Sequence, residues 1–121
     1  MCIRDSVGWS RICNRLYIWD YTTNFRHYIM PHPNLRALGP NVRFFVDHNV
    51  KGIFEQGAYT TNGAEMAELR AWVLAKLLWD PSRNADELID EFLEGYYGAA
   101  APYMKKYLNT CLLYTSDAAD E

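Results

Sequence analysis

Cysteine is scarce in this sequence, and its scarcity excludes two kinds of small domain. The three cysteines, Cys2, Cys13 and Cys111, are too few for a disulfide-stapled scaffold. Their spacing also matches no zinc-binding pattern, because such patterns place cysteines or histidines in close pairs. We therefore expect neither a disulfide framework nor a structural zinc ion.

Long apolar runs and excess positive charge are lacking as well. No apolar stretch approaches the roughly 20 residues that a membrane-spanning helix needs. The formal net charge is -3, so nothing favours nucleic acid or an anionic membrane surface as a partner. Half of the 121 residues are hydrophobic and 15% are aromatic, which indicates a packed globular domain rather than a disordered chain.

The two ends of the chain can be encoded by one DNA string. Residues 1–6 (MCIRDS) can be written as ATG TGT ATA AGA GAC AG followed by a free base. The complementary strand, read in another frame, encodes Cys-Leu-Leu-Tyr-Thr, which is the sequence of residues 111–115. The string resembles the transposon-end adapter of tagmentation sequencing libraries, and its continuation encodes residues 116–121. We therefore predict that residues 1–6 and 111–121 are adapter-derived and not native.

The alternative for these two segments is an ordinary N-terminus and an acidic C-terminal tail. If the adapter interpretation holds, residues 7–110 are a segment of a longer protein. That segment is formally neutral, and Cys13 is its only cysteine.

Two short apolar runs favour neighbouring strands of a parallel sheet. Leu16–Tyr21 (LYIWDY) is apolar on both faces except at Asp20, which is typical of a strand buried on both sides. Val50–Phe54 (VKGIF) is a second short apolar run, and we interpret it as another strand.

The connection between the two predicted strands is long enough to contain a helix. Thr22–Asn34 holds two prolines and is interpreted as a loop. Leu35–Leu38 is expected to form a short turn that ends at Gly39, and Pro40 suits the first position of a helix that runs to His48. A strand, a helical connection and a second strand imply a right-handed parallel crossover.

The rest of the chain is predicted to be helical. Asn62 with Glu65 three residues later is a capping-box pattern, which predicts a helix over Gly63–Trp79. This helix is apolar nearly all round, so we expect it to be covered on more than one side. A second helix with a clean apolar stripe is predicted over residues 84–98, and a third over Ala100–Leu108.

Two acidic residues stand at the carboxyl ends of the predicted strands. Asp20 closes the first strand and Glu55 the second. Functional groups gather past these ends in parallel sheets, so both acids are expected at one rim of one cleft. Glycoside hydrolysis uses paired carboxylates, and we predict Asp20 and Glu55 as catalytic residues. The alternative for each is a structural role, as a loop cap or an ion-pair partner.

Aromatic and polar residues lie near these acids in the sequence. Aromatic rings stack on sugar faces while their polar edges form hydrogen bonds, and amide and imidazole groups bind hydroxyls. The predicted substrate-binding residues are Trp19, Tyr21, Asn24, His32, Gln56 and Tyr59.

Other conspicuous residues have simpler interpretations. Trp72 and Trp79 lie on the apolar helix and are expected in the core. Gly57 and Gly63 lack the lysine that a phosphate-binding loop requires. We expect no metal ion and no cofactor.

Four stretches of the chain resemble a known family. LYIWDYTTNF, PHPNL, VKGIFEQG and AKLLWDPSRNADELIDEFLEGYYGAAAPYMKKYL together resemble the C-terminal part of a Bacteroidetes domain of unknown function, the one numbered forty-eight thirty-eight. Some members of that family are classed as glycoside hydrolase family one hundred and sixty-three, endo-β-N-acetylglucosaminidases that act on complex N-glycans. Members resemble alpha-glucuronidases in architecture, with a small α/β domain before a (β/α)8 barrel. The most specific parts of the resemblance are the Leu-Trp-Asp-Pro and Tyr-Tyr-Gly blocks.

The resemblance implies an α/β fold that is a truncated C-terminal portion of a (β/α)8 barrel. Residues 7–79 would contribute the last two parallel strands and their helices, and residues 80–110 would be a helical C-terminal appendage. The remainder of the parent barrel would be the partner of this segment, and a glycan its substrate. The resemblance also implies a periplasmic, cell-surface or secreted protein.

Three classes of function follow. The leading hypothesis is a fragment of a glycoside hydrolase that is inactive in isolation, because a two-strand remnant leaves sheet edges and one core face uncovered. The alternative is a non-catalytic carbohydrate-binding or scaffolding module, in which the aromatic residues bind sugar and the acids only form hydrogen bonds. A third interpretation makes the helical part an interaction domain.

Overall fold

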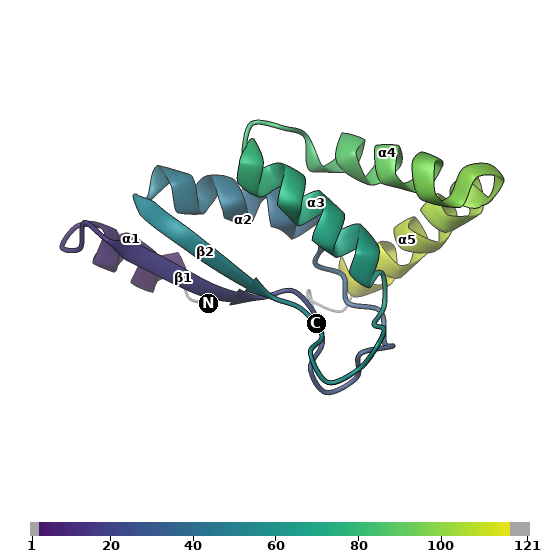
Figure 1. Cartoon of the computed structure of the whole chain (residues 1–121), viewed down its shortest axis with the longest axis horizontal. Helices are drawn as coiled ribbons and strands as arrows, with labels where there is room; N and C mark the ends of the chain where they lie inside the picture. The colour runs from purple at the N-terminus through teal and green to yellow at the C-terminus, as the bar shows by residue number, and fades with distance from the viewer. Residues whose placement is uncertain (1–2, 117–121) are drawn as a thin grey trace.

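A computed structural model describes residues 3–116 as a two-stranded parallel sheet with a group of helices (Figure 1). The fold is therefore mixed α/β, as the sequence predicts. In chain order the elements are α1 (Ile3–Ser10), β1 (Leu16–Tyr21), α2 (Leu35–Asp47), β2 (Val50–Gln56), α3 (Ala67–Trp79), α4 (Ala85–Tyr97), a 3-10 turn at Gly98–Ala100 and α5 (Ala101–Ser116).

The two predicted terminal segments are not separate elements in this fold. The boundary predicted at residue 6 lies inside α1, and the boundary predicted at residue 110 lies inside α5. Residues 1–2 and 117–121 of those segments lie outside the described part of the chain. The adapter origin of residues 1–6 and 111–121 stays a prediction.

The sheet confirms the predicted parallel pair. β1 has the predicted bounds, and β2 extends two residues beyond the predicted Val50–Phe54. In the register, Asp20 lies opposite Glu55 and Tyr21 lies opposite Gln56. Parallel neighbours need a long crossover connection, and the segment that contains α2 supplies it.

The two faces of the sheet differ in exposure. Successive side chains of a strand point to opposite faces, so Ile18 and Glu55 share one face through the register. On that face Ile18 is buried, and Glu55 lines a cavity together with residues of α3. The opposite face carries aromatic side chains that are all more than half exposed: Tyr17, Trp19, Tyr21 and Phe54. The expectation that β1 is buried on both sides is wrong here, because none of the described elements covers this aromatic face.

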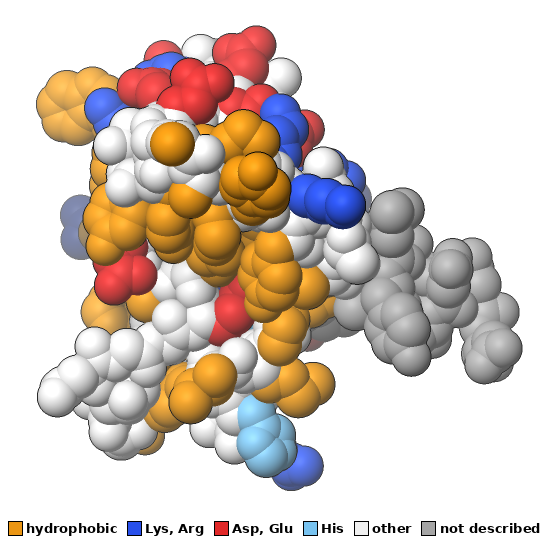
Figure 2. All heavy atoms as spheres, turned by 90° about the vertical axis from the view of Figure 1, so that its right-hand side faces the viewer, with side chains coloured by type: hydrophobic (Ala, Val, Ile, Leu, Met, Phe, Trp, Pro, Cys, Tyr) orange, Lys and Arg blue, Asp and Glu red, His pale blue; other side chains and the backbone are white. Residues whose placement is uncertain are grey.

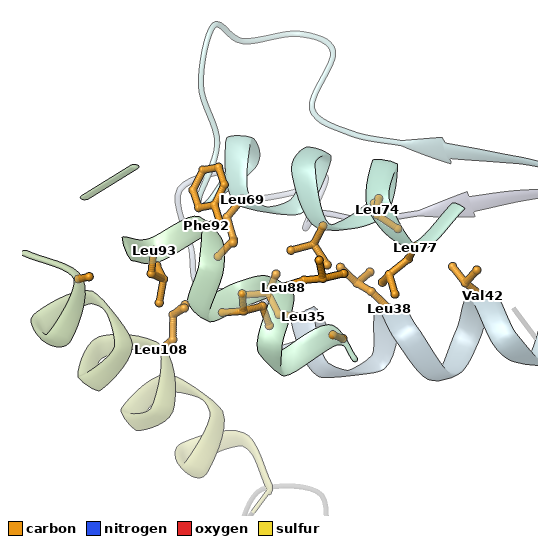
Figure 3. Close-up of a cluster of buried hydrophobic side chains, with 14 residues drawn as sticks. Leu35, Leu38, Val42, Leu69, Leu74, Leu77, Leu88, Phe92, Leu93 and Leu108 are labelled. Carbon is orange, nitrogen blue, oxygen red and sulfur yellow. The ribbon is translucent and has the colours of Figure 1, made fainter. Parts of the chain in front are cut away.

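The main hydrophobic core lies among the helices. α3 packs against α2 and α4, and α4 in turn packs against α5. Leu69, Leu77 and Leu88 are among its most deeply buried side chains. Figure 3 shows side chains of all four helices meeting in this core, among them Leu35, Leu38, Val42, Leu74, Phe92, Leu93 and Leu108.

Helix α2 is one continuous element, which corrects a sequence expectation. The turn over Leu35–Leu38 and the separate helix from Pro40 are both wrong, since Pro40 lies inside α2. A proline inside a helix costs about 3 kcal/mol. However, α2 buries several apolar side chains, and each of them contributes about 1.5–3 kcal/mol when fully buried: Leu35, Leu38, Val42 and Phe45. Gly39 lets α2 approach α4 closely, because a Cβ atom there would lie 3.1 Å from the Cβ of Ala85.

Helix α3 begins four residues later than predicted. The capping box of Asn62 and Glu65 does not form, and residues 57–66 are a loop that ends at Met66 in a left-handed conformation. The loop is held by tertiary contacts instead: the Glu65 backbone N–H donates to the Tyr28 carbonyl, 2.8 Å away. The Glu65 carboxylate pairs with Arg70 rather than with the helix end.

The predicted end of α3 and the predicted start and end of α4 are confirmed. α3 ends before Asp80, and Asn84 caps α4 by accepting a hydrogen bond from the Asp86 N–H at 2.9 Å. Gly98 ends α4 with a φ of 52°, a conformation that favours glycine. The third predicted helix corresponds to α5, which runs beyond the expected Leu108.

Apolar side chains remain exposed on the outer side of the helices. Trp72 is partly buried and packs against Phe92, as expected, but Trp79 is 91% exposed, so its expected core position is wrong. The contacts of α3 with α2 and α4 cover only part of its apolar surface. Figure 2 shows a band of hydrophobic side chains across the end of the molecule that carries α4 and α5. Within residues 3–116, no helix has both the length and the apolar character that crossing a bilayer requires.

The core predicts different outcomes for two adjacent leucines of α3. Leu77 is fully buried, so Leu77→Ala should lower the free energy of unfolding by about 2–5 kcal/mol. Leu78 is 43% exposed, so the matched variant Leu78→Ala should cost under about 1 kcal/mol. Urea denaturation followed by circular dichroism measures both values. Equal losses would contradict the described packing of α3.

Candidate functional site

The two predicted catalytic carboxyl groups lie side by side at the end of the sheet. Asp20 and Glu55 are register partners on neighbouring strands. Burial and the negative charge of Asp20 raise the pKa of Glu55 from 4.5 to about 7. The Asp20 Oδ1 accepts a hydrogen bond from the Tyr21 N–H at 2.9 Å, which fixes this carboxyl at the strand end. The predicted proximity of the two acids is therefore confirmed, and their catalytic role stays a prediction.

Glu55 faces a small cavity between the strand ends and α3. The cavity has a volume of about 150 Å³. Within the described residues, the Glu55 carboxyl group accepts and donates no hydrogen bond. The other lining residues include Thr22, Thr23, Ala58, Ala67, Arg70 and Ala71.

Trp19 and Gln56 lie on the opposite face of the sheet from the acids. The Trp19 indole N–H donates to the Gln56 Oε1 at 2.8 Å, and the Trp19 ring packs edge-on against Phe54 at 5.0 Å. Sequence reasoning grouped these residues with Asp20 and Glu55 around one cleft. The structure separates them, because adjacent strand positions point to opposite faces.

A cluster of aromatic rings joins the loops that follow β1 and β2. Phe25 lies at its centre, with ring centroids 5.5 Å from Tyr21, 6.0 Å from Tyr28 and 6.2 Å from Tyr59. Tyr21 and Tyr59 are more than half exposed, so their ring faces are accessible. Two predicted substrate-binding residues, Tyr21 and Tyr59, are thus brought together, with Phe25 as the contact between them.

Asn24 and His32 have structural interactions in their loop. The Asn24 Oδ1 accepts hydrogen bonds from the N–H groups of Arg26 and His27 at 3.0 and 3.3 Å. The His32 carbonyl oxygen accepts a hydrogen bond from Arg70 at 2.7 Å. Burial lowers the pKa of His32, and the positive charge of Arg70 lowers it further, so the ring is neutral at neutral pH.

Arg70 is the residue of this region that sequence reasoning missed. It is 3% exposed and forms an ion pair of 2.5 Å with the Glu65 carboxylate. Its guanidinium also donates to the His32 carbonyl and to the Asn34 Oδ1, so it ties the loops after both strands to α3. The sequence did contain a signal for this role, because Arg70 stands among the apolar residues of α3. A charged side chain that is buried there must form an ion pair or hydrogen bonds.

No metal site emerges from this arrangement. Among residues 3–116, no group of three His, Cys, Asp or Glu side chains is placed to hold a metal ion.

The fold and the site define an α/β domain with paired carboxyl groups at the ends of two parallel strands. Residues 2–109 match the family model described as Domain of unknown function (DUF4838), and the chain belongs to this family. The family part of the sequence resemblance is thereby confirmed. No curated protein and no solved structure matches the chain.

The buried ion pair predicts a large effect of Arg70 on stability. Arg70→Met leaves the Glu65 carboxylate buried without its partner, which should lower the free energy of unfolding by about 3–5 kcal/mol. Adding Glu65→Gln should restore part of the loss, because the unpaired charge is removed. The matched control is Arg36→Met, which breaks an exposed ion pair with Asp86 and should cost under about 1 kcal/mol. Equal losses in urea titrations of Arg70→Met and Arg36→Met would contradict the buried role of Arg70.

The raised pKa of Glu55 predicts a pH dependence of stability. Between pH 4.5 and about 7 the folded chain holds a proton that the unfolded chain releases, so stability from this group falls as pH rises through that range. Relative to Glu55→Gln, the wild type should lose about 1–3 kcal/mol across the range. Glu94→Gln, at an exposed position of α4, should show no such difference. Thermal unfolding at several pH values measures the stability of each variant. Parallel curves of stability against pH for the wild type and Glu55→Gln would refute this prediction.

Proposed function

We propose that this chain is a segment of a glycoside hydrolase that cleaves glycosidic bonds in complex glycans. The observation that carries the proposal is Glu55, a carboxyl group with a pKa of about 7 beside Asp20 at the end of two parallel strands. A general acid works best when its pKa lies near the operating pH, so Glu55 is suited to protonate a leaving oxygen. Asp20 would then be the second carboxyl group, as nucleophile or base.

The sheet supports the further proposal that β1 and β2 are the last two strands of a (β/α)8 barrel. In such barrels the helices cover the outer face, and the inner face meets side chains of the other strands. Here α2 contacts β2, α3 lies on the side of Glu55, and the aromatic face with Trp19 and Phe54 is open. The remainder of the parent barrel would cover this face. Active sites of these barrels lie past the carboxyl ends of the strands, where Asp20 and Glu55 stand.

The family resemblance refines this proposal. It points to an endo-β-N-acetylglucosaminidase of complex N-glycans, in a Bacteroidetes protein that is periplasmic, displayed on the cell surface or secreted. Under this proposal the isolated chain is inactive, since two strands leave both sheet edges and the aromatic face uncovered.

A carbohydrate-binding or scaffolding module is the second candidate. The exposed rings of Trp19, Tyr21 and Tyr59 favour it, because aromatic rings that stand free of the core can stack on sugars. In that case Asp20 and Glu55 contribute hydrogen bonds and no proton transfer.

The test separates the two candidates in the longer protein that we propose contains this segment. Turnover and binding are measured on glycan substrates for the wild type and for Glu55→Gln. A glycosidase role predicts that Glu55→Gln lowers kcat by about 10²–10⁴-fold with binding retained. Glu94→Gln is the matched control and should keep wild-type turnover.

A wild-type protein that binds glycans without turnover, and loses binding in Trp19→Ala, would support the binding module and overturn the glycosidase. Hydrolysis of aryl glycosides by the isolated chain would overturn its proposed inactivity.

A further inference from the structure

The cavity beside Glu55 has the size of one small ring. A cavity of about 150 Å³ in another protein holds a benzene molecule, so the same volume here accommodates a six-membered ring. Part of its wall is formed by small apolar residues of the loop after β2 and of α3: Ala58, Ala64, Ala67 and Ala71. Methyl groups of this kind pack against the C–H face of a saturated ring.

Two hydrogen-bonding groups in the cavity are unused. Within the described residues, neither the Glu55 carboxyl group nor the Thr23 hydroxyl forms a hydrogen bond, although Thr23 is buried. Neither group is shut off from solvent, because no buried side-chain nitrogen or oxygen of the described residues lacks a hydrogen-bond partner. Both groups can therefore reach an occupant of the cavity, and together they offer a donor and several acceptors.

The charge of the lining favours a neutral occupant. Arg70 and Glu65, which also line the cavity, neutralise each other in a buried ion pair. Glu55 faces Asp20 across the strands, and its raised pKa keeps much of it protonated at neutral pH. An anionic ligand in the cavity would meet the Glu65 carboxylate, and a cation would meet Arg70, and neither would find an unpaired counter-charge in the lining.

We propose that this cavity binds one neutral sugar ring, with Glu55 and Thr23 as its hydrogen-bonding partners. Hydroxyl groups of the ring match the two unused polar groups, and its C–H face matches the alanine wall. The choice of a sugar rests on the proposed function. Under this inference one sugar unit binds on the side of the sheet that faces α3, rather than on the aromatic face.

The 121-residue chain itself is the material for the test. Alanine methyl groups and the rings of tryptophan and tyrosine are labelled with carbon-13, and their NMR signals are followed while methyl glucoside or methyl N-acetylglucosaminide is added. The inference predicts shifts at Ala58, Ala67 and Ala71, and weaker binding of charged glucuronate by at least tenfold.

Three variants sharpen the result. Ala71→Leu fills the cavity and should weaken binding at least tenfold, whereas the matched Ala75→Leu, one turn further along α3 and outside the cavity, should bind as the wild type does. Thr23→Val removes one hydroxyl at nearly constant volume and should weaken binding several-fold, even if Ala71→Leu does not fold. Glu55→Gln should keep binding within a few-fold, because an amide also donates and accepts hydrogen bonds.

The outcomes separate this inference from the proposed function. Sugar-induced shifts confined to Trp19, Tyr21 and Tyr59, and unchanged in Ala71→Leu, would overturn the cavity site while leaving a glycan-binding protein. Glucuronate binding as tight as that of the neutral glycosides, or no shift with any sugar, would also overturn it. The glycosidase proposal is decided independently, by the turnover of Glu55→Gln in the longer protein.

Discussion

The buried guanidinium of Arg70 organises the end of the sheet at which the candidate site lies. Its donors reach His32 and Asn34 in the loop after β1, and Glu65 in the loop after β2. Because a buried charge without partners is very costly, these groups must stay in place for the chain to fold. Two loops of otherwise irregular structure thereby acquire a fixed position over α3. Arg70 and Glu65 also line the cavity beside Glu55, so the same ion pair forms part of its wall.

The second constraint is the alternation of side chains along the strands. It sends Asp20 and Glu55 toward α3 and sends Trp19 and Gln56 to the open face. The chain therefore presents two chemically different surfaces that share one backbone. The surface that faces α3 combines a titratable carboxyl group with small apolar side chains. The open surface is a broad aromatic layer, which under the proposed function meets the rest of a barrel.

Local signals in the sequence predicted much of the fold, and long-range contacts explain the rest. The LYIWDY run predicted β1 with its bounds, and Asn84 predicted the start of α4, because strand preference and helix capping depend on neighbouring residues. Pro40 misled the prediction of α2, since burial of the helix outweighs one lost hydrogen bond. The pairing of Asp20 with Glu55 followed from strand order alone. The role of Arg70 did not, because its partners come from loops whose paths no local pattern reveals.

The crossover between the strands has a consequence for the order of folding. β1 and β2 pair only after the intervening 28 residues, positions 22–49, have brought them together, whereas α3, α4 and α5 meet their neighbours in direct succession. Contacts between neighbouring segments close small loops and form quickly, and contacts across long loops form slowly. We therefore infer that the helical group forms first and that the sheet docks onto it later. On this inference the carboxyl pair assembles in the final step, so the region with the most distinctive chemistry acquires its shape last.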